Sequence, residues 1–407
     1  MTPTARLTAA GFVATAVAFG PARMGFGLFL PAFREEFALT TSMAGLIASG
    51  GFLAFLLALP ASAWLGSRQG QRMPVVAGAL AATAGFAAVA AAGTPGLLAL
   101  GIALAGTSAG LCWAPFNDAA ERVVPDAVRA GALSVVATGT TIGVAAAAGL
   151  ALAVTEGMLD WRGAWAGFAL GGLAVAGIAL AGLPPGRSPA PARDEGAPGP
   201  SLAQSAAAPL YITALCFGMT NAVFLSFAAD RVVAAGGLPG LPEEAASAVI
   251  FLGYGICGLL GLATGRIEAR TGLAPLFCAI FAAAALSLVL IALAPGSWSA
   301  VLAASGLHGA ALMMVSAVFS FWSLRLFPGR GTLGFTATLL SLAAGSVLGP
   351  ALAGLLAEAR GPEVMFLAAA APSLATAIWF GARLRRPRPR LPSTTGDGQS
   401  STTPRLD

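Results

Sequence analysis

Apolar runs of about 20 residues recur from one end of the chain to the other, and they limit the possible folds more than any other feature. An α-helix rises about 1.5 Å per residue, so a run of about 20 residues crosses the hydrocarbon core of a bilayer. Only 10% of the residues are charged, whereas a soluble domain carries about 25%. The sequence therefore predicts an all-α polytopic membrane protein that lies in a lipid bilayer.

Charged, proline-rich and glycine-rich breaks divide the chain into twelve predicted transmembrane helices in two groups of six. The first six cover residues 8–31, 42–65, 73–92, 97–120, 130–154 and 162–183. The last six cover residues 207–229, 245–265, 273–294, 298–324, 332–356 and 362–382. We expect two six-helix bundles, at 1–183 and 207–383, joined by a flexible proline- and alanine-rich linker at 184–206 and followed by a disordered tail at 384–407.

The arginines are distributed unequally between the two sides of these spans. If the N-terminus lies in the cytoplasm, 17 arginines fall on the cytoplasmic side, and four, Arg34, Arg162, Arg231 and Arg360, fall on the other side. Cytoplasmic loops of membrane proteins carry an excess of basic residues. We therefore expect both termini and the linker to lie in the cytoplasm.

Several kinds of chemistry are not expected of this chain. All 22 basic residues are arginines, so the lysine that a P-loop needs to hold nucleotide phosphates is missing. The chain has one histidine, no acidic residue near the middle of a predicted span, and four cysteines without the spacing of a metal site. We expect no enzyme activity, cofactor, metal or nucleic-acid partner; a membrane-embedded enzyme is the alternative from another functional class.

The two halves match each other at a nearly constant offset. Three pairs of markers are 202 or 203 residues apart: RQG at 68–70 with RTG at 270–272, Gly143 with Gly345, and RVVP at 122–125 with RLFP at 325–328. Markers in register indicate a duplicated six-helix unit, the architecture in which two bundles rock about a central site.

The chain resembles permeases of the major facilitator superfamily over essentially its whole length. AWLGSRQGQRMP at 63–74 is similar to the signature loop between the second and third helices of that superfamily, although Ser67 stands where an aspartate is usual. GRIEARTG at 265–272 is similar to the degenerate second copy of the loop. GPARMGFGLFLP at 20–31 and AGLIASGGFLAFLLA at 44–58 are similar to uncharacterised bacterial permeases of the YbfB/YjiJ type. The resemblance implies a monomeric secondary transporter of the bacterial inner membrane.

Charged residues and glycines at the cytoplasmic ends of the spans share an expected role as an inner gate or as contacts that hold the loops. Glycine lets a loop turn sharply, and arginine anchors it on the cytoplasmic face. These residues are Arg68, Gly70, Arg72, Asp118, Arg122, Arg270, Gly272 and Arg325.

The resemblance also implies that helices 1, 4, 7 and 10 line a central cavity. Arg23, Asn221 and His308 lie at similar depths in the predicted spans 1, 7 and 10. Polar residues inside a membrane mark functional sites by default. We therefore predict that Arg23, Asn221 and His308 bind the substrate and that Trp113 provides an apolar wall.

Arg23 carries a charge that it does not lose in a protein. Asp230, at the outer end of the seventh predicted span, could pair with it, or the side chain could extend outward to the membrane surface. We adopt a third hypothesis, that Arg23 receives an anionic substrate, because the planar guanidinium fork matches a carboxylate. His308 could exchange a proton during the cycle, since histidine titrates near neutral pH, or it could be a hydrogen-bonded core residue.

The predicted function is secondary active transport of a small organic anion, coupled to protons, by alternating access between the two bundles. An efflux antiporter for hydrophobic or drug-like compounds is the alternative within transport. In the superfamily that the chain resembles, a Gly-Pro pair in the fifth helix is associated with antiport. In this chain the fifth span has Gly143-Val144 instead, and a Gly-Pro pair, Gly349-Pro350, occurs in the eleventh span. That pair fits antiport, or a kink with a close helix contact.

Overall fold

The computed structural model describes residues 2–186, 201–328 and 331–384. Every regular element in these ranges is helical, and twelve spans are long and apolar enough to cross a membrane. The predicted all-α fold with twelve transmembrane helices is therefore confirmed. Most of the predicted linker and nearly all of the predicted tail lie outside the described residues.

The helices divide into two sets along the chain, and each predicted span overlaps an observed one. The first set is α1 (Pro3–Phe19), α2 (Pro21–Phe37), α3 (Thr41–Gln69), α4 (Arg72–Ala90), α5 (Pro95–Val123), α6 (Asp126–Thr155) and α7 (Trp161–Gly182). The second set is α8 (Ala208–Val233), α9 (Ala245–Gly258), α10 (Thr264–Thr271), α11 (Leu273–Leu293), α12 (Trp298–Leu326), α13 (Gly331–Arg360) and α14 (Pro362–Leu384). Two short 3-10 turns are η1 (Ser205–Ala207) and η2 (Leu259–Ala263).

Two of the predicted spans are interrupted rather than continuous α-helices. The first span consists of α1 and α2, which meet at Gly20 with φ −78° and ψ −104°. Pro21 follows and has no N–H, so the helical hydrogen bond that this residue would donate is lost. The eighth span consists of α9, η2 and α10, because the chain passes through a 3-10 turn. Hydropathy does not reveal the interruption at Gly20, since most residues on both sides of it are apolar.

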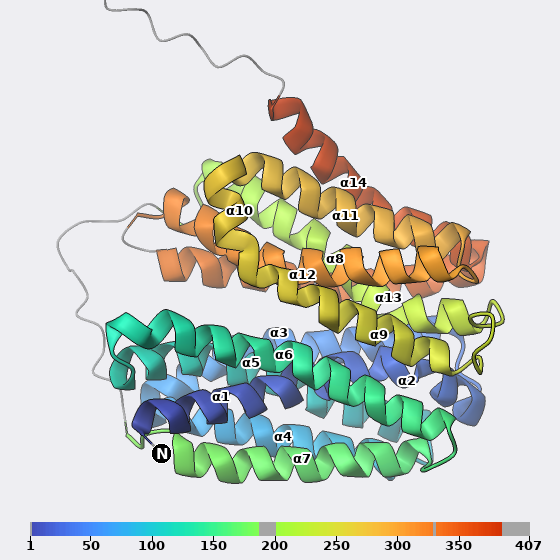
Figure 1. The fold of residues 1–407 in the computed structure, drawn as a ribbon, viewed down its shortest axis with the longest axis horizontal. Helices are drawn as coiled ribbons and strands as arrows, with labels where there is room; N and C mark the ends of the chain where they lie inside the picture. Colours follow the sequence, from blue (N-terminus) through green and yellow to red (C-terminus); the bar gives the residue numbers. More distant parts are fainter. Residues whose placement is uncertain (1, 187–200, 329–330, 385–407) are drawn as a thin grey trace, which may run out of the picture.

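The two sets of helices form two bundles that lie side by side, with α1–α7 below and α8–α14 above in Figure 1. The internal repeat of the sequence is also a repeat of geometry. Gly70 and Gly272 follow α3 and α10 with φ of 88° and 84°. A Cβ atom on Gly143 would lie 2.0 Å from a carbonyl oxygen of α1, and one on Gly345 would lie 2.1 Å from a carbonyl oxygen of α8. Glycine therefore permits the same close helix crossing in both halves.

Contacts between the halves lie at the end of the molecule that holds the α2–α3 and α8–α9 connections, at the right of Figure 1. There α3 packs against α13, α2 against α8, and α6 against α9. Gly349-Pro350 belongs to this contact, since a Cβ on Gly45 of α3 would lie 2.3 Å from the Pro350 carbonyl oxygen. That close approach supports the helix-contact interpretation of the pair. Within the described ranges, α1, α5, α10 and α12 make no substantial contact with the opposite half.

Candidate functional site

Arg23 lies in the first turn of α2, three residues after the interruption at Gly20. The new helix begins there without a side-chain cap, and the start of a helix carries a partial positive charge. The interruption thus places a fixed cation and a helix N-terminus together inside the first membrane span. Discontinuous helices of this kind form binding sites in membrane transporters.

Aromatic rings surround the Arg23 guanidinium. Its Cζ atom lies 4.5 Å from the ring centre of Phe55, 5.6 Å from that of Phe52 and 5.9 Å from that of Phe19. Trp113 of α5 packs edge-on against Phe19, with 5.6 Å between ring centres. Ring faces attract a cation electrostatically, so these contacts offset part of the cost of holding the charge in the membrane.

No ion pair of the described residues includes Arg23, and its buried Nε has no hydrogen-bond partner among them. Asp230 is not its partner. That carboxylate is paired with Arg34, whose Nε lies 2.8 Å from Asp230 Oδ1, and the pair joins α2 to α8. The sequence alternative of a fixed Arg23–Asp230 pair is therefore wrong, because Asp230 pairs with Arg34 where α2 meets α8.

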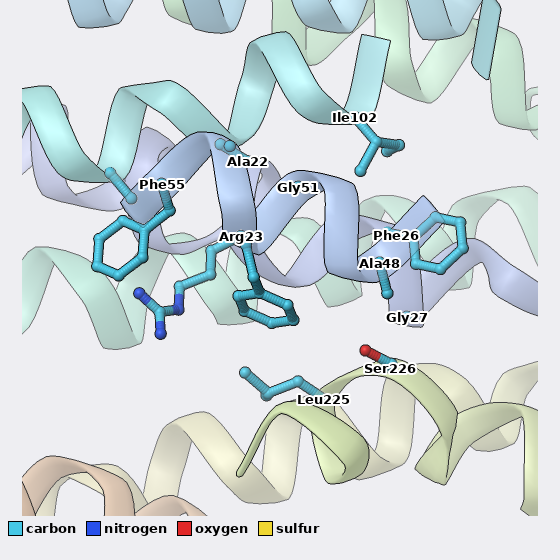
Figure 2. Close-up of a pocket in the computed structure, with 13 residues that line it drawn as sticks. Ala22, Arg23, Phe26, Gly27, Ala48, Gly51, Phe55, Ile102, Leu225 and Ser226 are labelled. Carbon is cyan, nitrogen blue, oxygen red and sulfur yellow. The ribbon is translucent and has the colours of Figure 1, made fainter. Parts of the chain in front are cut away.

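A small, narrow pocket opens beside Arg23 between the two halves (Figure 2). Arg23 is its one charged lining residue; the others are small, aliphatic or aromatic except for Ser226. The side chain of Arg23 extends past Phe55 and away from Gly27 and Ser226 (Figure 2). The lining residues are Ala22, Arg23, Phe26, Gly27, Ala48, Gly51, Phe52, Phe55, Ile102, Gly106, Ala109, Leu225 and Ser226.

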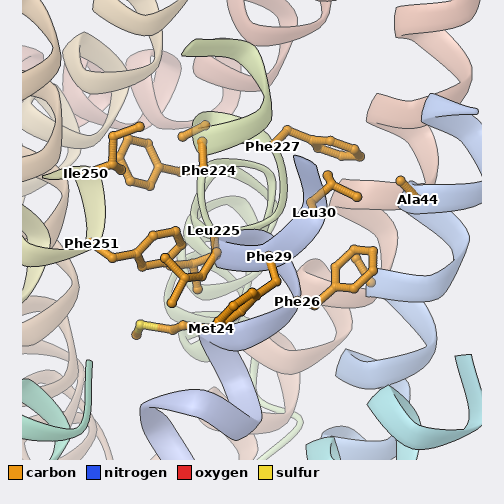
Figure 3. Close-up of a cluster of buried hydrophobic side chains, with 14 of the residues drawn as sticks. Met24, Phe26, Phe29, Leu30, Ala44, Phe224, Leu225, Phe227, Ile250 and Phe251 are labelled. Carbon is orange, nitrogen blue, oxygen red and sulfur yellow. The ribbon is translucent and has the colours of Figure 1, made fainter. Parts of the chain in front are cut away.

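Apolar side chains from both halves seal the region beyond the pocket. Figure 3 shows residues of α2, α8 and α9 in one cluster, with Met24 extending toward Phe251. At Gly27 the helices nearly touch, since a Cβ on this residue would lie 1.7 Å from the Leu225 carbonyl oxygen. The pocket therefore ends at a tight contact between α2 and α8.

The second half contributes buried polar side chains with unused hydrogen-bonding atoms. Asn221 of α8 is fully buried, and neither amide atom has a partner among the described residues. The His308 ring of α12 stacks on Phe224 at 4.0 Å between ring centres. Tyr254 of α9 packs beside both rings, and its buried hydroxyl also has no partner within the described part of the chain.

One hydrogen bond of His308 shows that its Nδ1 atom carries a proton. Its Nδ1 lies 2.7 Å from Ser287 Oγ, and the same hydroxyl donates to the Ala284 carbonyl at 2.7 Å. A serine hydroxyl has a single proton, so Ser287 accepts the bond from Nδ1–H of His308. His308 Nε2 has no hydrogen-bond partner among the described residues, and in the neutral ring it carries a lone pair.

The structure places the four predicted binding residues two in each half and shows no direct contact between any of them. Arg23 and Trp113 both contact Phe19 in the first half. Asn221 and His308 belong to the second half, where Phe224 stacks on His308 one helical turn after Asn221. No contact joins the two pairs among the described residues, and their binding role stays a prediction.

Tyr254 and the phenylalanines around Arg23 are the residues that the sequence analysis missed. Their stretches have the composition of ordinary packing segments. For Tyr254 there was one signal, since it is one of two tyrosines in the chain and lies in the middle of a predicted span.

The predicted gate residues hold each loop to its own half. Gln71 Nε2 donates to Asp118 Oδ2 at 2.8 Å, which joins the α3–α4 connection to α5. In the second half, Arg325 Nη2 lies 2.6 Å from Glu268 Oε1, which joins α12 to α10. Arg68 lies over its neighbour Trp64 at 4.9 Å. A gate between the halves at this end stays a prediction.

Twelve membrane-length helices in two repeated halves, with a pocket between the halves, form the architecture of a membrane transporter. The sequence profile of the Major Facilitator Superfamily matches residues 11–291. The chain belongs to this superfamily.

Solved structures support the fold across nearly the whole chain. An engineered variant of the nucleoside transporter NupG is 13% identical, with a TM-score of 0.76, over 94% of this chain and 100% of that one. A variant of the peptide transporter POT is 14% identical, with a TM-score of 0.73, over 94% and 93%. A bacterial homologue of the human lysosomal transporter Spinster, in an inward-facing and occupied conformation, is 16% identical, with a TM-score of 0.70, over 94% and 96%. No curated protein sequence matches the chain.

Proposed function

We propose that the protein moves a small organic anion across the membrane by alternating access and that Arg23 binds the anion. The observation that carries this proposal is a guanidinium at an apolar pocket between the halves, with no ion-pair partner in the part of the chain that the structure describes. A charge inside a membrane is costly unless it is paired or meets water. An anionic substrate would supply the missing charge and accept hydrogen bonds from the guanidinium fork.

The contacts between the halves support alternating access. They lie at one end of the molecule, opposite the N-terminus and the α3–α4 connection. With both termini in the cytoplasm, this conformation is closed to the outside, and Arg23 is reached from the cytoplasmic side. The proposal places the protein in the bacterial inner membrane as a monomer, in keeping with the similarity to permeases of the YbfB/YjiJ type.

Proton coupling is the second part of the proposal, and His308 is the residue that would carry the proton. The unused lone pair on Nε2 is a base inside the membrane. Asn221, one turn from the ring that stacks on His308, would bind polar groups of the substrate. Trp113 would hold the aromatic wall around Arg23 through Phe19.

Efflux of hydrophobic compounds is the second candidate function. A groove of about 500 Å³ lies between α8, α13 and α14, and its ten lining residues are all apolar or glycine. Such a groove suits an apolar compound, whereas a cationic one would find no mid-membrane acid with which to pair. The two candidates differ in one respect, since transport of an apolar compound would not depend on Arg23.

Flux into proteoliposomes tests the proposal. We would measure uptake of labelled acetate, lactate, succinate and benzoate, with and without a pH gradient, for the wild type and for Arg23→Gln. The matched control is Arg360→Gln, which removes an exposed arginine far from the pocket. A charge-assisted hydrogen bond is worth roughly 10- to 150-fold in affinity, so Arg23→Gln should lose uptake by about that factor and remain monodisperse. Anion uptake that is equal in Arg23→Gln and the wild type would contradict the proposal.

A further inference from the structure

We propose that the substrate is a monocarboxylate with a flat, apolar body, and that Arg23 of the first half and Tyr254 of the second half bind its carboxylate together. This inference rests on the proposed function, because it specifies the anion and adds a binding residue. It draws on three features of the site: its charge, the shape of its walls and the position of Tyr254.

The single positive charge of the pocket matches a substrate with one negative charge. Arg23 is the one charged residue that lines it, and the described residues place no second cation there. A dicarboxylate or a phosphate dianion would bring a second negative charge into the pocket. That charge would have neither water nor a cation beside it, which is unfavourable in an apolar site. A monocarboxylate leaves the site neutral.

The walls of the pocket fit a flat body. Phe52 and Phe55 line the pocket close to the Arg23 guanidinium, and an aromatic ring stacks favourably on such side chains. Gly51 and Gly106 also line the pocket, where α3 and α5 are so close that a Cβ on Gly106 would lie 2.4 Å from the Gly51 carbonyl oxygen. Backbone without side chains gives a smooth wall, so the space suits a ring better than a branched chain.

The internal repeat relates Tyr254 to a residue that lines the pocket. A Cβ on Gly309 of α12 would lie 2.0 Å from the Tyr254 carbonyl oxygen, just as one on Gly106 of α5 would lie 2.4 Å from that of Gly51. Tyr254 lies 203 residues after Gly51, and Gly309 lies 203 residues after Gly106. Tyr254 therefore occupies in the second half the position that Gly51 occupies in the first. Since Gly51 lines the pocket, the equivalent position in α9 faces the same central space.

The helices that carry Arg23 and Tyr254 are in contact. Met24, next to Arg23 in α2, extends toward Phe251 of α9, three residues before Tyr254 (Figure 3). The Tyr254 hydroxyl is buried without a hydrogen-bond partner among the described residues. A carboxylate between the two groups would accept N–H bonds from Arg23 and an O–H bond from Tyr254, which satisfies both. Because the two groups belong to different halves, the bound carboxylate would also hold the halves together.

Calorimetric titration of the purified full-length protein in detergent tests this inference. The probes are benzoate, the neutral isostere benzamide, acetate without a ring, and the dianion phthalate. We expect benzoate to bind and each of the other three to bind at least about 10-fold more weakly, because each lacks one recognised feature or adds a charge. Tyr254→Phe keeps the ring stacked on its neighbours and should weaken benzoate binding about 10-fold or more, with an unchanged melting temperature.

Tyr211→Phe is the matched control, because the only other tyrosine donates to the Leu202 carbonyl at 3.0 Å near the start of α8. It should leave benzoate binding unchanged. Equal benzoate affinity in Tyr254→Phe and the wild type would overturn the role of Tyr254. Absence of benzoate binding would overturn the substrate class. Arg23-dependent binding of phthalate or acetate that is tighter than that of benzoate would also overturn the substrate class, but it would leave the proposed function standing. If no anion binds in an Arg23-dependent way, both proposals fail.

Discussion

The ion pair between Arg34 and Asp230 should act as a latch on the end of the molecule where the two halves meet, which is the outer end in the proposed topology. It is one of the few charged contacts that cross between the halves, with 2.8 Å between Arg34 Nε and Asp230 Oδ1. Arg34 also donates to the Leu39 carbonyl and to Thr41 Oγ1, at 3.1 and 2.8 Å, and both of these partners belong to its own half. Asp230→Asn would therefore weaken the contact between the halves and leave Arg34 held in place.

The size of the effect follows from the burial of the pair. The side chains are 26% and 15% exposed, between a surface pair, which is worth up to about 1 kcal/mol, and a buried one, whose disruption costs about 3–5 kcal/mol. We expect Asp230→Asn to destabilise the closed outer end by about 1–2 kcal/mol, which changes the ratio of closed to open molecules roughly 5- to 30-fold.

Distance measurement by pulsed electron paramagnetic resonance would detect this change. Spin labels on cysteines at Met158 and Leu241, which are 72% and 37% exposed on different halves, report the opening of the outer end in a background without native cysteines. Asp230→Asn should shift the distribution to longer distances. Glu36→Gln is the control, because Glu36 pairs with Arg162 at 2.8 Å within one half. An unchanged distribution in Asp230→Asn, or an equal shift in Glu36→Gln, would refute the latch.

Two further predictions concern topology and coupling. Cysteines at Ser188, which lies outside the described residues, and at Ser297 should label from opposite sides of the membrane; an impermeant reagent that labels both in intact cells would contradict the cytoplasmic termini. His308→Gln should retain exchange of substrate between the two sides while losing acceleration by an imposed pH gradient, because glutamine cannot take up the proton; unchanged dependence on the gradient would remove His308 from the coupling mechanism.

The spans were predictable because one physical requirement dominates them. Every backbone group in the bilayer must be hydrogen-bonded internally, so length and hydropathy alone place helices such as α11 within a residue or two. The interruption at Gly20 escaped this reasoning, although proline at the first position of α2 is a typical helix-start signal. Hydropathy averages over such a local break.

The partners of the charged residues were less predictable. Both Arg23 and Arg34 precede Asp230 in the sequence, and only the contact between α2 and α8 decides that Arg34 takes it. Tyr254 likewise emerged from the crossing of α9 with α12 rather than from its neighbours in the sequence. If the halves rearrange as proposed, the sequence has to be compatible with more than one set of contacts between them, and no single set can be derived from it.

The glycines at helix crossings bear on how mutational scans of this protein should be interpreted. Side chains at Gly143 or Gly345 would collide with a backbone oxygen of the same half, so substitutions there should remove the protein from the membrane. Substitutions at Arg23 should leave its abundance intact and affect growth on the substrate. Gly27 belongs to neither class, because a side chain there would meet Leu225 of the opposite half. A scan that scores both abundance and growth would therefore separate folding, binding and conformational positions, whereas a scan that scores growth alone would merge them.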